Sequence, residues 1–304
     1  MAYVLSEYVK LTNEDCIHNG YKYEEGINVL NEPFNEQKIC SKGGLYFCRK
    51  EDVYTWLSYN NQIMHYIWDV VVPDDAKIVD MNDKLKTDKF ILSNKRSIWD
   101  NYDFCKLAVQ QNGLSLQYVK EQTEEICKFA VQHTGLSLEY VNNQTYEICK
   151  LAVQQNGDSL KYVKNRTYEI CKLAVQQYGY ALQYVKNQTE EICKLAVQHY
   201  SGALKHVKEQ TEEICKLAVQ HTGLSLEYVN NQTEEICILA VQKNGRALRY
   251  VEEQTEEICK LAVQQNGYFL EFVKEKKEEI CKLAVQQNHY SLYHVPENMK
   301  HLFM

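Results

Sequence analysis

Cysteine is the residue type that could most readily do chemistry in this chain, because nine of the twelve cysteines recur at a fixed spacing of 22 residues. They are Cys105, Cys127, Cys149, Cys171, Cys193, Cys215, Cys237, Cys259 and Cys281. Zinc needs four ligands that converge on one point, and a disulfide needs two cysteines in direct contact. This spacing puts one cysteine in each repeat, so we predict small packing residues that hold no metal. The other three, Cys16, Cys40 and Cys48, show no metal-ligand spacing either.

The helix that must position each cysteine can be read from one repeat unit, TYEICKLAVQQNGDSLKYVKNR, at 145–166. Thr145 is a favourable N-cap, and Gly157 follows the last residue of the helical pattern, where we expect a left-handed C′ conformation. A helix over 146–156 would gather five apolar side chains on an arc of about 200°. They are Ile148, Cys149, Leu151, Ala152 and Val153. An arc that wide must be covered from more than one side.

A second, shorter helix over about 158–164 completes the unit, with Leu160, Tyr162 and Val163 turned inward. A helical hairpin of this size cannot bury its apolar face alone, whereas stacked copies can. The period therefore predicts an all-α solenoid of short helical hairpins. We assign it to 96–304, as nine units of 22 residues and a degenerate C-terminal cap that begins near Met299.

Positions that stay constant between repeats differ in meaning from positions that vary. One glutamine is present in all nine units, from Gln110 to Gln286. We interpret it as a hydrogen-bonded ladder between layers, with a binding stripe as the alternative. Two places vary, one after the glycine and one before the usual tyrosine, and arginine or tyrosine there resembles interface anchors. The predicted partner-binding residues are Asp158, Tyr180, Arg246, Arg249 and Tyr268, with drift on a solvated face as the alternative.

The array resembles a repeat family of unknown function that is abundant in giant viruses of amoebae and in some intracellular bacteria. The units of that family carry the same E-I-C-K-L-A-V-Q-Q-N-G core followed by L-x-Y-V, which here covers about 101–299. The stretch AVQHTGLSLEYVNNQT is identical at 130–145 and 218–233, a pattern that fits recent expansion. The resemblance implies a source and a fold, and it carries no activity.

Residues 1–95 lack the 22-residue frame and predict a small α+β domain, called the head below. A helix over 50–59 would place Val53, Trp56 and Leu57 on one side. Strands are expected at 27–30, 45–48, 67–72, 76–79 and 89–92.

The head has two resemblances of its own. The order of HNGYKYEEGINVLNEPF, CSKGGLYFC and VVVPDDAKIV over about 15–95 resembles the N-terminal module of giant-virus ankyrin-repeat proteins, which implies a modular adaptor. A looser resemblance is to ADP-ribosyltransferases, which use an H-G-S/T strand, then G-I-Y-F, then a glutamate. It would make His18 a ligand of the NAD ribose and Tyr46 a stacking partner of nicotinamide. Here HNG replaces H-G-S/T, and no glutamate is clearly placed.

Composition narrows the function classes. A net charge of −7 disfavours nucleic acid and anionic membranes as partners. No run of about 18 apolar residues predicts a transmembrane helix, and the N-terminal MAYVLSEYVK lacks signal-peptide features. We expect an intracellular protein, in the host cytoplasm or the viral factory if it is viral.

The resulting prediction is a non-enzymatic adaptor or scaffold whose array binds a protein partner, with a host protein among the candidates. It has no catalytic residue, metal or cofactor. One alternative is an NAD-using, ADP-ribosyltransferase-like head with a targeting array. Another is a self-assembling structural protein, and the oligomeric state is left open.

Overall fold

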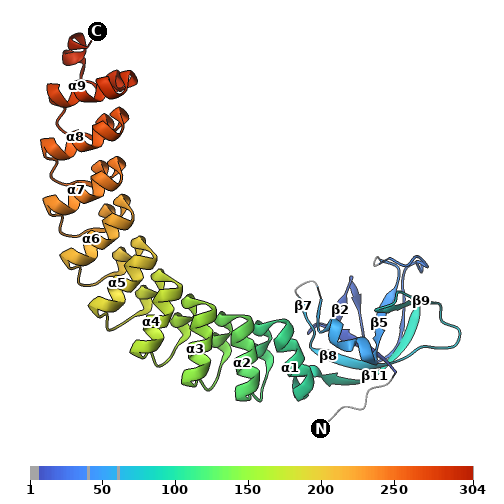
Figure 1. Ribbon diagram of the computed structural model, residues 1–304. Coiled ribbons are helices and arrows are strands. Elements are labelled where there is room, and N and C mark those ends of the chain that lie inside the picture. Colours follow the sequence, from blue (N-terminus) through green and yellow to red (C-terminus); the bar gives the residue numbers. More distant parts are fainter. Residues whose placement is uncertain (1–6, 40–41, 60–61, 304) are drawn as a thin grey trace. The chain divides into compact units, whose positions relative to one another are not determined.

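The computed structural model describes residues 7–39, 42–59 and 62–303. The chain divides into two compact units, Met1–Gln155 and Asn156–Met304, and each is described by itself. The first unit holds the head and the first helices of the array, and the second holds the remaining repeats (Figure 1). A sheet region is thus followed by short helices in regular repeats, which confirms the predicted fold class.

The head is built on a seven-stranded antiparallel sheet of order β4-β11-β8-β1-β5-β10-β9. Its strands are β1 (Tyr8–Thr12), β4 (Gly26–Val29), β5 (Leu45–Arg49), β8 (Tyr66–Val71), β9 (Ile78–Asp80), β10 (Leu85–Thr87) and β11 (Lys89–Ser97). Two small hairpins add β2 (Ile17–His18) with β3 (Tyr21–Lys22), and β6 (Ser58–Tyr59) with β7 (Gln62–Ile63). A 3₁₀ helix, η1 (Lys50–Trp56), follows β5.

The five strands predicted in the head are confirmed as β4, β5, β8, β9 and β11. The helix expected over 50–59 is the 3₁₀ helix η1, and the chain re-enters a strand at Ser58. Strands β1 and β10 were not predicted, although β1 lies between β8 and β5 in the sheet. Each of these strands carries a lysine, Lys10 in β1 and Lys86 in β10, and both side chains are buried. A charged residue in a short strand interrupts the apolar pattern from which a strand is predicted.

The core of the head is rich in aromatic rings. Phe47 of β5 meets the rings of Tyr8 and Phe90 edge-on, at centroid distances of 5.5 and 5.9 Å. Tyr23 stacks on Phe90 from the other side at 5.9 Å. Trp68 joins the same cluster and donates from Nε1 to Thr12 Oγ1 at 3.1 Å. These contacts fix the central strands that carry the pocket described below.

Within the first unit, the head packs directly on the first repeat. Strand β11 runs past the predicted boundary at 95/96 and leads into η2 (Ile98–Asp100). The ring of His65 lies against Trp99 and Tyr118, with centroids 5.8 and 4.5 Å away. Asn101 caps the first array helix by accepting from Phe104 N at 3.1 Å, as predicted for the residue that replaces threonine.

Each repeat is a ten-residue α-helix followed by a six-residue 3₁₀ helix. In the first unit these are α1 (Tyr102–Gln111), η3 (Gly113–Tyr118), α2 (Glu124–His133), η4 (Gly135–Tyr140) and α3 (Tyr146–Gln155). In the second unit they are η5 (Gly157–Tyr162), α4 (Tyr168–Gln177), η6 (Gly179–Tyr184), α5 (Glu190–His199), η7 (Ser201–His206), α6 (Glu212–His221), η8 (Gly223–Tyr228), α7 (Glu234–Lys243), η9 (Gly245–Tyr250), α8 (Glu256–Gln265), η10 (Gly267–Phe272), α9 (Glu278–Gln287) and η11 (His289–His294). The degenerate cap predicted near Met299 is the 3₁₀ helix η12 (Glu297–Leu302).

In each unit the helices form two layers, with α-helices beside α-helices and 3₁₀ helices beside 3₁₀ helices (Figure 1). The predicted apolar arc of the α-helix faces the space between the layers. In the repeat unit read above, Ile148, Cys149, Ala152 and Val153 are buried, and Leu151 is half-buried. The interior is therefore made of the same small and branched side chains in every repeat, and the cysteine is one of them.

The predicted left-handed conformation at Gly157 is wrong. Among the described glycines only Gly20, Gly26 and Gly43 have a positive φ. The array glycine lies instead where the next repeat approaches closely, although Ser201 occupies the same place in η7. A Cβ atom on Gly179 would lie 2.6 Å from the carbonyl oxygen of Ala196, and one on Gly157 would lie 2.5 Å from that of Ala174. His289 occupies this place beyond α9, after which the described residues form no further α-helix whose carbonyl it could meet.

Candidate functional site

Neighbouring repeats are joined by a glutamine side chain in the turn before most of the α-helices. Gln210 Nε2 donates to Tyr228 O of the next repeat at 2.8 Å, and its Oε1 accepts from Asn230 N at 2.9 Å. Nε2 also lies 3.3 Å from Leu204 O of its own repeat. Gln122, Gln188, Gln232 and Gln254 make the same two bonds to the following repeat. This glutamine, called the staple below, forms hydrogen bonds with a backbone carbonyl at the end of one 3₁₀ helix and with a backbone amide in the turn that follows it.

The ladder was predicted for a different glutamine. The residues at that invariant place, from Gln110 to Gln286, are exposed in eight repeats, and Gln176 is half-buried. The last residue of an α-helix makes a second set of hydrogen bonds between repeats. Gln265, which ends α8, accepts at Oε1 from Gly245 N at 2.7 Å. Glutamine side chains thus do form hydrogen bonds between repeats, as predicted. They are the staple glutamines, however, because the side chain of the invariant glutamine points away from the neighbouring layer.

In the second unit the staple glutamine is replaced by Lys276 before α9 and by Arg166 before α4. Arg166 Nε and Nη2 donate to Leu160 O and Lys161 O of its own repeat, at 3.0 and 2.9 Å. The corresponding bonds to the next repeat, which by the spacing of the other staples would involve Tyr184 O and Lys186 N, are not made by this side chain. A cavity of about 350 Å³ lies there, lined by Arg166, Cys171, Val185 and neighbouring residues.

The residues predicted to bind a partner lie on the 3₁₀ layer. Arg246 and Arg249 on η9 and Tyr268 on η10 are exposed. The guanidinium of Arg249 lies over the rings of Tyr250 and Phe272, at 5.1 and 5.8 Å from their centroids. The structure therefore brings these three residues together on two adjoining 3₁₀ helices.

The other two predicted residues lie on η5 and η6. Asp158 is half-buried and pairs with Lys161 at 2.8 Å, and its second oxygen accepts from Tyr184 OH at 3.2 Å. The hydrogen bond with Asp158 raises the pKa of Lys161. Burial, together with the charge of Asp158, raises the pKa of Tyr184. Asp158 is thus already committed to its neighbours, which leaves it less available to a partner than the exposed arginines.

Tyr180 belongs to an aromatic cluster that sequence reasoning missed in part. Its ring centroid is 4.4 Å from Tyr200 and 5.7 Å from Tyr178, and Lys205 Nζ lies 4.6 Å above it. Tyr178 and Tyr200 lie two residues before the variable place that follows the glycine, and both are exposed. Gly202 makes room for the cluster, because a Cβ atom there would lie 2.5 Å from Tyr200 Cε1. We call Tyr178, Tyr180 and Tyr200 the tyrosine patch.

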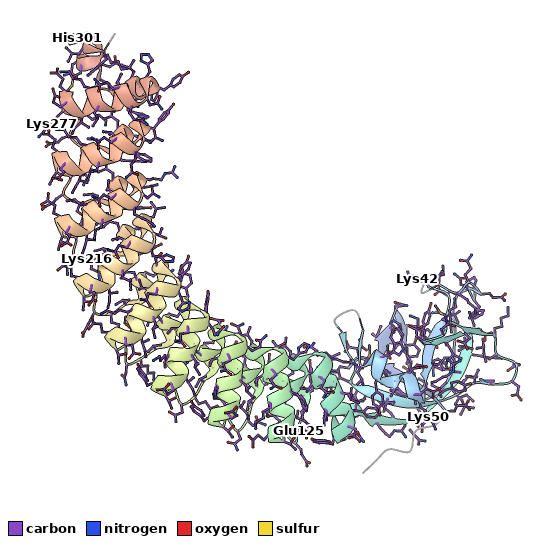
Figure 2. All side chains as sticks on the ribbon, in the orientation of Figure 1. Lys42, Lys50, Glu125, Lys216, Lys277 and His301 are labelled. Carbon is purple, nitrogen blue, oxygen red and sulfur yellow. The ribbon has the colours of Figure 1, made fainter. Side chains whose placement is uncertain are left out.

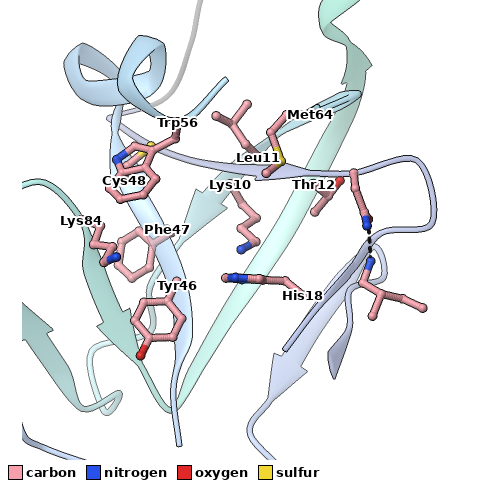
Figure 3. A pocket seen from close by; sticks show the side chains of 12 residues that line it. Lys10, Leu11, Thr12, His18, Tyr46, Phe47, Cys48, Trp56, Met64 and Lys84 are labelled. Atoms are coloured by element: carbon pink, nitrogen blue, oxygen red, sulfur yellow. Dashed lines mark hydrogen bonds between the residues drawn. The ribbon is translucent and has the colours of Figure 1, made fainter. Parts of the chain in front are cut away.

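A separate pocket lies in the head, at one end of β1, β2 and β5 (Figure 3). It is lined by Lys10, Leu11, Thr12, Asn13, Ile17, His18, Tyr46, Phe47, Cys48, Trp56, Met64 and Lys84. The HNG stretch that carries His18 is a tight hairpin turn, in which Asn19 and Gly20 have φ of 52° and 82° as a type I′ turn requires. Asn13 Oδ1 accepts from Ile17 N at 2.9 Å and holds the approach to this hairpin.

The two residues of the transferase alternative meet in this pocket. The rings of His18 and Tyr46 lie 6.0 Å apart, edge to face. Burial, together with the charges of Lys10 and Lys84, lowers the pKa of His18 to about 4. Among the described residues that line the pocket, none is the glutamate or aspartate that such an enzyme would need.

Lys10 was not identified from the sequence as a site residue. Its side chain is only 3% exposed, and Nζ lies 4.4 Å from the centroid of the Tyr23 ring. Burial lowers the pKa of this amine to about 7, and Lys84 lowers it further against the opposing effect of Cys48. A lysine in an alternating strand usually lies on the solvated face, so the pattern around it gave no signal.

The repeat cysteines are buried, and burial raises the pKa of Cys127, Cys193 and Cys237 to about 11. Cys193 Sγ lies 3.7 Å from the staple oxygen Gln188 Oε1. Within the part of the chain that the structure describes, no three His, Cys, Asp or Glu side chains gather as metal ligands would. Cys40 lies outside the described residues.

A family model described as a domain of unknown function, DUF4116, matches the chain at 123–167, 145–189, 211–255, 233–276 and 255–300. Together these matches cover just over half of the chain. The chain belongs to this family. Each DUF4116 match spans about two successive repeats.

Relatives of this DUF4116 protein occur in Acanthamoeba polyphaga mimivirus. The uncharacterized protein R869 is 29% identical over 98 residues, which are 32% of this chain and 71% of the relative. The putative ankyrin repeat protein R868 is 30% identical over 96 residues, 31% of this chain and 48% of the relative. The putative ankyrin repeat protein R896 is 26% identical over 72 residues, 23% of this chain and 22% of the relative.

The family match and these relatives confirm the predicted resemblance to giant-virus repeat proteins. This DUF4116 chain spans half or less of the two ankyrin-repeat relatives. No solved structure matches it significantly. Among the described residues, no helix has the length and apolar character needed to cross a membrane.

Proposed function

We propose that this chain is a non-enzymatic protein-binding adaptor, in which the 3₁₀ layer of the array contacts a partner protein. The class of its relatives supports the proposal, since two of them are named putative ankyrin repeat proteins. Stacked repeats commonly present an extended binding surface of this kind. We further propose a host protein as the partner, and the host cytoplasm or viral factory as the place of action.

One observation carries the proposal. The interior of the array hardly changes from repeat to repeat, whereas the places that vary are mostly exposed and lie on the 3₁₀ helices. Aromatic side chains gather there: Tyr178 and Tyr200 are 43% and 47% exposed, and Tyr290 and Tyr293 are 74% and 83% exposed. Tyrosine and arginine supply much of the binding energy at protein interfaces, because they offer a large contact area with a polar end.

The opposite layer has a different character. Lys194 of α5 pairs with Glu190 of its own helix at 3.0 Å and with Glu213 of the next repeat at 2.7 Å. Lys216 repeats this arrangement with Glu212 and Glu235, and Figure 2 shows Lys216 on the side of the α-helices. Exposed ion pairs that already satisfy one another offer little to a partner.

The proposal is tested by capture from an extract of an amoebal host with the full chain. The test variant carries Tyr178→Ser, Tyr180→Ser and Tyr200→Ser. The control carries three charge-removing changes on the α layer, Glu169→Gln, Glu191→Gln and Glu213→Gln. We expect a protein that binds the wild type and the control and is lost from the tyrosine variant, with circular dichroism unchanged in all three. Equal capture by the tyrosine variant would refute the role of the patch.

The transferase alternative is favoured by the meeting of His18 and Tyr46 in one pocket. It is disfavoured by the lining of that pocket, which among the described residues contains no carboxylate. Incubation with labelled NAD separates the two functions, since an adaptor neither hydrolyses NAD nor transfers ADP-ribose.

A further inference from the structure

The head pocket gathers three basic side chains from three parts of the chain. Lys10 comes from β1, His18 from β2 and Lys84 from the turn between β9 and β10. Figure 3 shows the Lys10 amine and the His18 imidazole pointing toward one another, with Lys84 on the opposite wall. Lys84 Nζ and the centroid of the His18 ring lie 5.6 and 6.0 Å from the centroid of the Tyr46 ring, so both groups border the same part of the pocket.

Other basic side chains of the head have polar partners: the buried Lys86 donates from Nζ to Gln37 O at 2.6 Å, and three more pair with carboxylates. Arg96 pairs with Asp69, Arg49 with Asp80, and Lys89 with Asp75. The pocket that holds Lys10 has no carboxylate in its lining among the described residues. A cation without a counter-charge is costly to bury, so a lysine in this place destabilises the folded protein unless something compensates it.

We propose that this pocket binds a small oxyanion, such as a carboxylate or a phosphate group, between Lys10 and His18 with Lys84 at the entrance. The site goes beyond the adaptor function, since it lies in the head and involves no residue of the array. Lys10 and His18 point toward one another (Figure 3), and both can donate a hydrogen bond to an anion bound between them.

The size and walls of the pocket fit such a ligand. Its volume of about 60 Å³ holds several water molecules, or one group of the size of a carboxylate or phosphate. Leu11, Met64 and the rings of Trp56 and Tyr46 line the remainder, so an apolar portion attached to the anion would be accommodated. Lys84 Nζ lies 4.5 Å from the Trp56 ring centroid, which holds the amine at the edge of the space.

Binding must be coupled to proton uptake. Burial lowers the pKa of Lys10 to about 7 and that of His18 to about 4, so His18 is neutral at pH 6 and above, whereas Lys10 loses its charge near pH 7. An anion favours the protonated forms and raises both pKa values. The titratable side chains that surround the space are Lys10, His18, Tyr23, Tyr46, Cys48 and Lys84, with Glu51 and Asp52 acting on Cys48 from η1. Burial raises the pKa of Cys48 to about 12, so the thiol stays neutral over the range tested.

The test is calorimetric titration of the full chain with sulfate and, separately, with benzoate. Both probes keep a constant charge between pH 6 and pH 9, so a change of affinity with pH reports the protein groups. We expect saturable binding of at least one probe, weakening by up to about tenfold per pH unit above pH 7 as Lys10 loses its proton. Stronger binding of sulfate would indicate a phosphate-type ligand, and stronger binding of benzoate a carboxylate with an apolar portion.

The decisive variant is Lys10→Met, which keeps the length of the side chain and removes the amine. It is expected to fold, because an apolar side chain replaces a buried cation, and to weaken binding at least tenfold at pH 6.5. The control is Lys77→Met, which makes the same change of charge in the head at a residue that does not line the pocket. Absence of saturable binding of both probes to the wild type overturns the proposal, and so does equal binding by Lys10→Met.

Discussion

Replacing Gln210 with alanine tests what holds neighbouring repeats together. The side chain bridges the backbone of the next repeat, at 2.8 Å to Tyr228 O and 2.9 Å to Asn230 N. A hydrogen bond of this kind contributes about 1 kcal/mol, and a buried group left without a partner costs about 1–3 kcal/mol. Because Asn230 is exposed and water can reach its amide, we expect the lower end for each bond, about 2 kcal/mol for the junction.

The matched control is Gln220→Ala in α6. Gln220 belongs to the glutamine that is invariant between repeats, and it is exposed. We expect a loss below about 0.5 kcal/mol, the usual range for a surface substitution. The converse change, Arg166→Gln, introduces the staple where it is missing and should stabilise that junction by about 1–2 kcal/mol.

Hydrogen exchange at the Asn230 amide is the suitable assay, because repeats contact mainly their neighbours and open locally rather than all at once. A loss of about 2 kcal/mol corresponds to about 30-fold faster exchange. In the Arg166→Gln variant the amide of Lys186 should be the one that slows. If Gln220→Ala accelerates exchange at Asn230 as much as Gln210→Ala does, the staple has been assigned to the wrong glutamine.

Three further predictions concern the packing and the charge of single residues. Gly179→Ala should destabilise its junction by about 1–3 kcal/mol, because the new Cβ atom would lie 2.6 Å from Ala196 O. Thermal melting equal to the wild type would show that the neighbouring helix can move away; Ser201 already occupies the equivalent place in η7. Thiol labelling at pH 8 should leave Cys193 unmodified until the array unfolds, because it is buried and its pKa is raised to about 11; rapid labelling of the native protein would contradict the packing role. The wild type should gain about 2 kcal/mol of stability relative to Lys10→Met between pH 7 and pH 9, because the folded amine has a pKa of about 7 and is already losing its proton while the unfolded one remains charged. Urea denaturation at both pH values measures this difference, and a constant difference would mean that Lys10 is solvated.

The array could be predicted from sequence because its signals are local. A threonine three residues before a buried isoleucine precedes most of the α-helices, and Thr189 caps its helix by accepting from Ile192 N at 3.3 Å. The apolar arc around Cys193 follows from helical periodicity alone. The role of Gly179 could not be read in this way, since it depends on how closely the next repeat approaches. The same holds for the staple, whose partners lie 18 and 20 residues further along the chain.

The candidate sites also differ in whether local sequence signals could predict them. Variation between repeats pointed to Arg246, Arg249 and Tyr268, and these are exposed on adjoining 3₁₀ helices. It gave no sign of the head pocket, because Lys10 and Lys84 are far apart in sequence and Lys10 is buried only by the segments that fold over β1. Sequence patterns report the face of one element, whereas a pocket is made where several elements meet.

The two layers of the array present different surfaces to a partner protein. Lysine and glutamate recur on the α layer with nearly the same pairing, so Lys194 and Lys216 present almost identical surroundings. A protein that contacts this layer cannot tell one repeat from the next, and it would bind weakly because the charges are already paired and hydrated. On the 3₁₀ layer the place after the glycine holds leucine, aspartate, tyrosine, glycine or arginine, so most repeats differ there, although η4 and η8 share one sequence. A partner that requires a fixed register on the array therefore has to contact the 3₁₀ helices, and exchanging residues 178–184 for the sequence of 222–228 should abolish its binding without disturbing the fold.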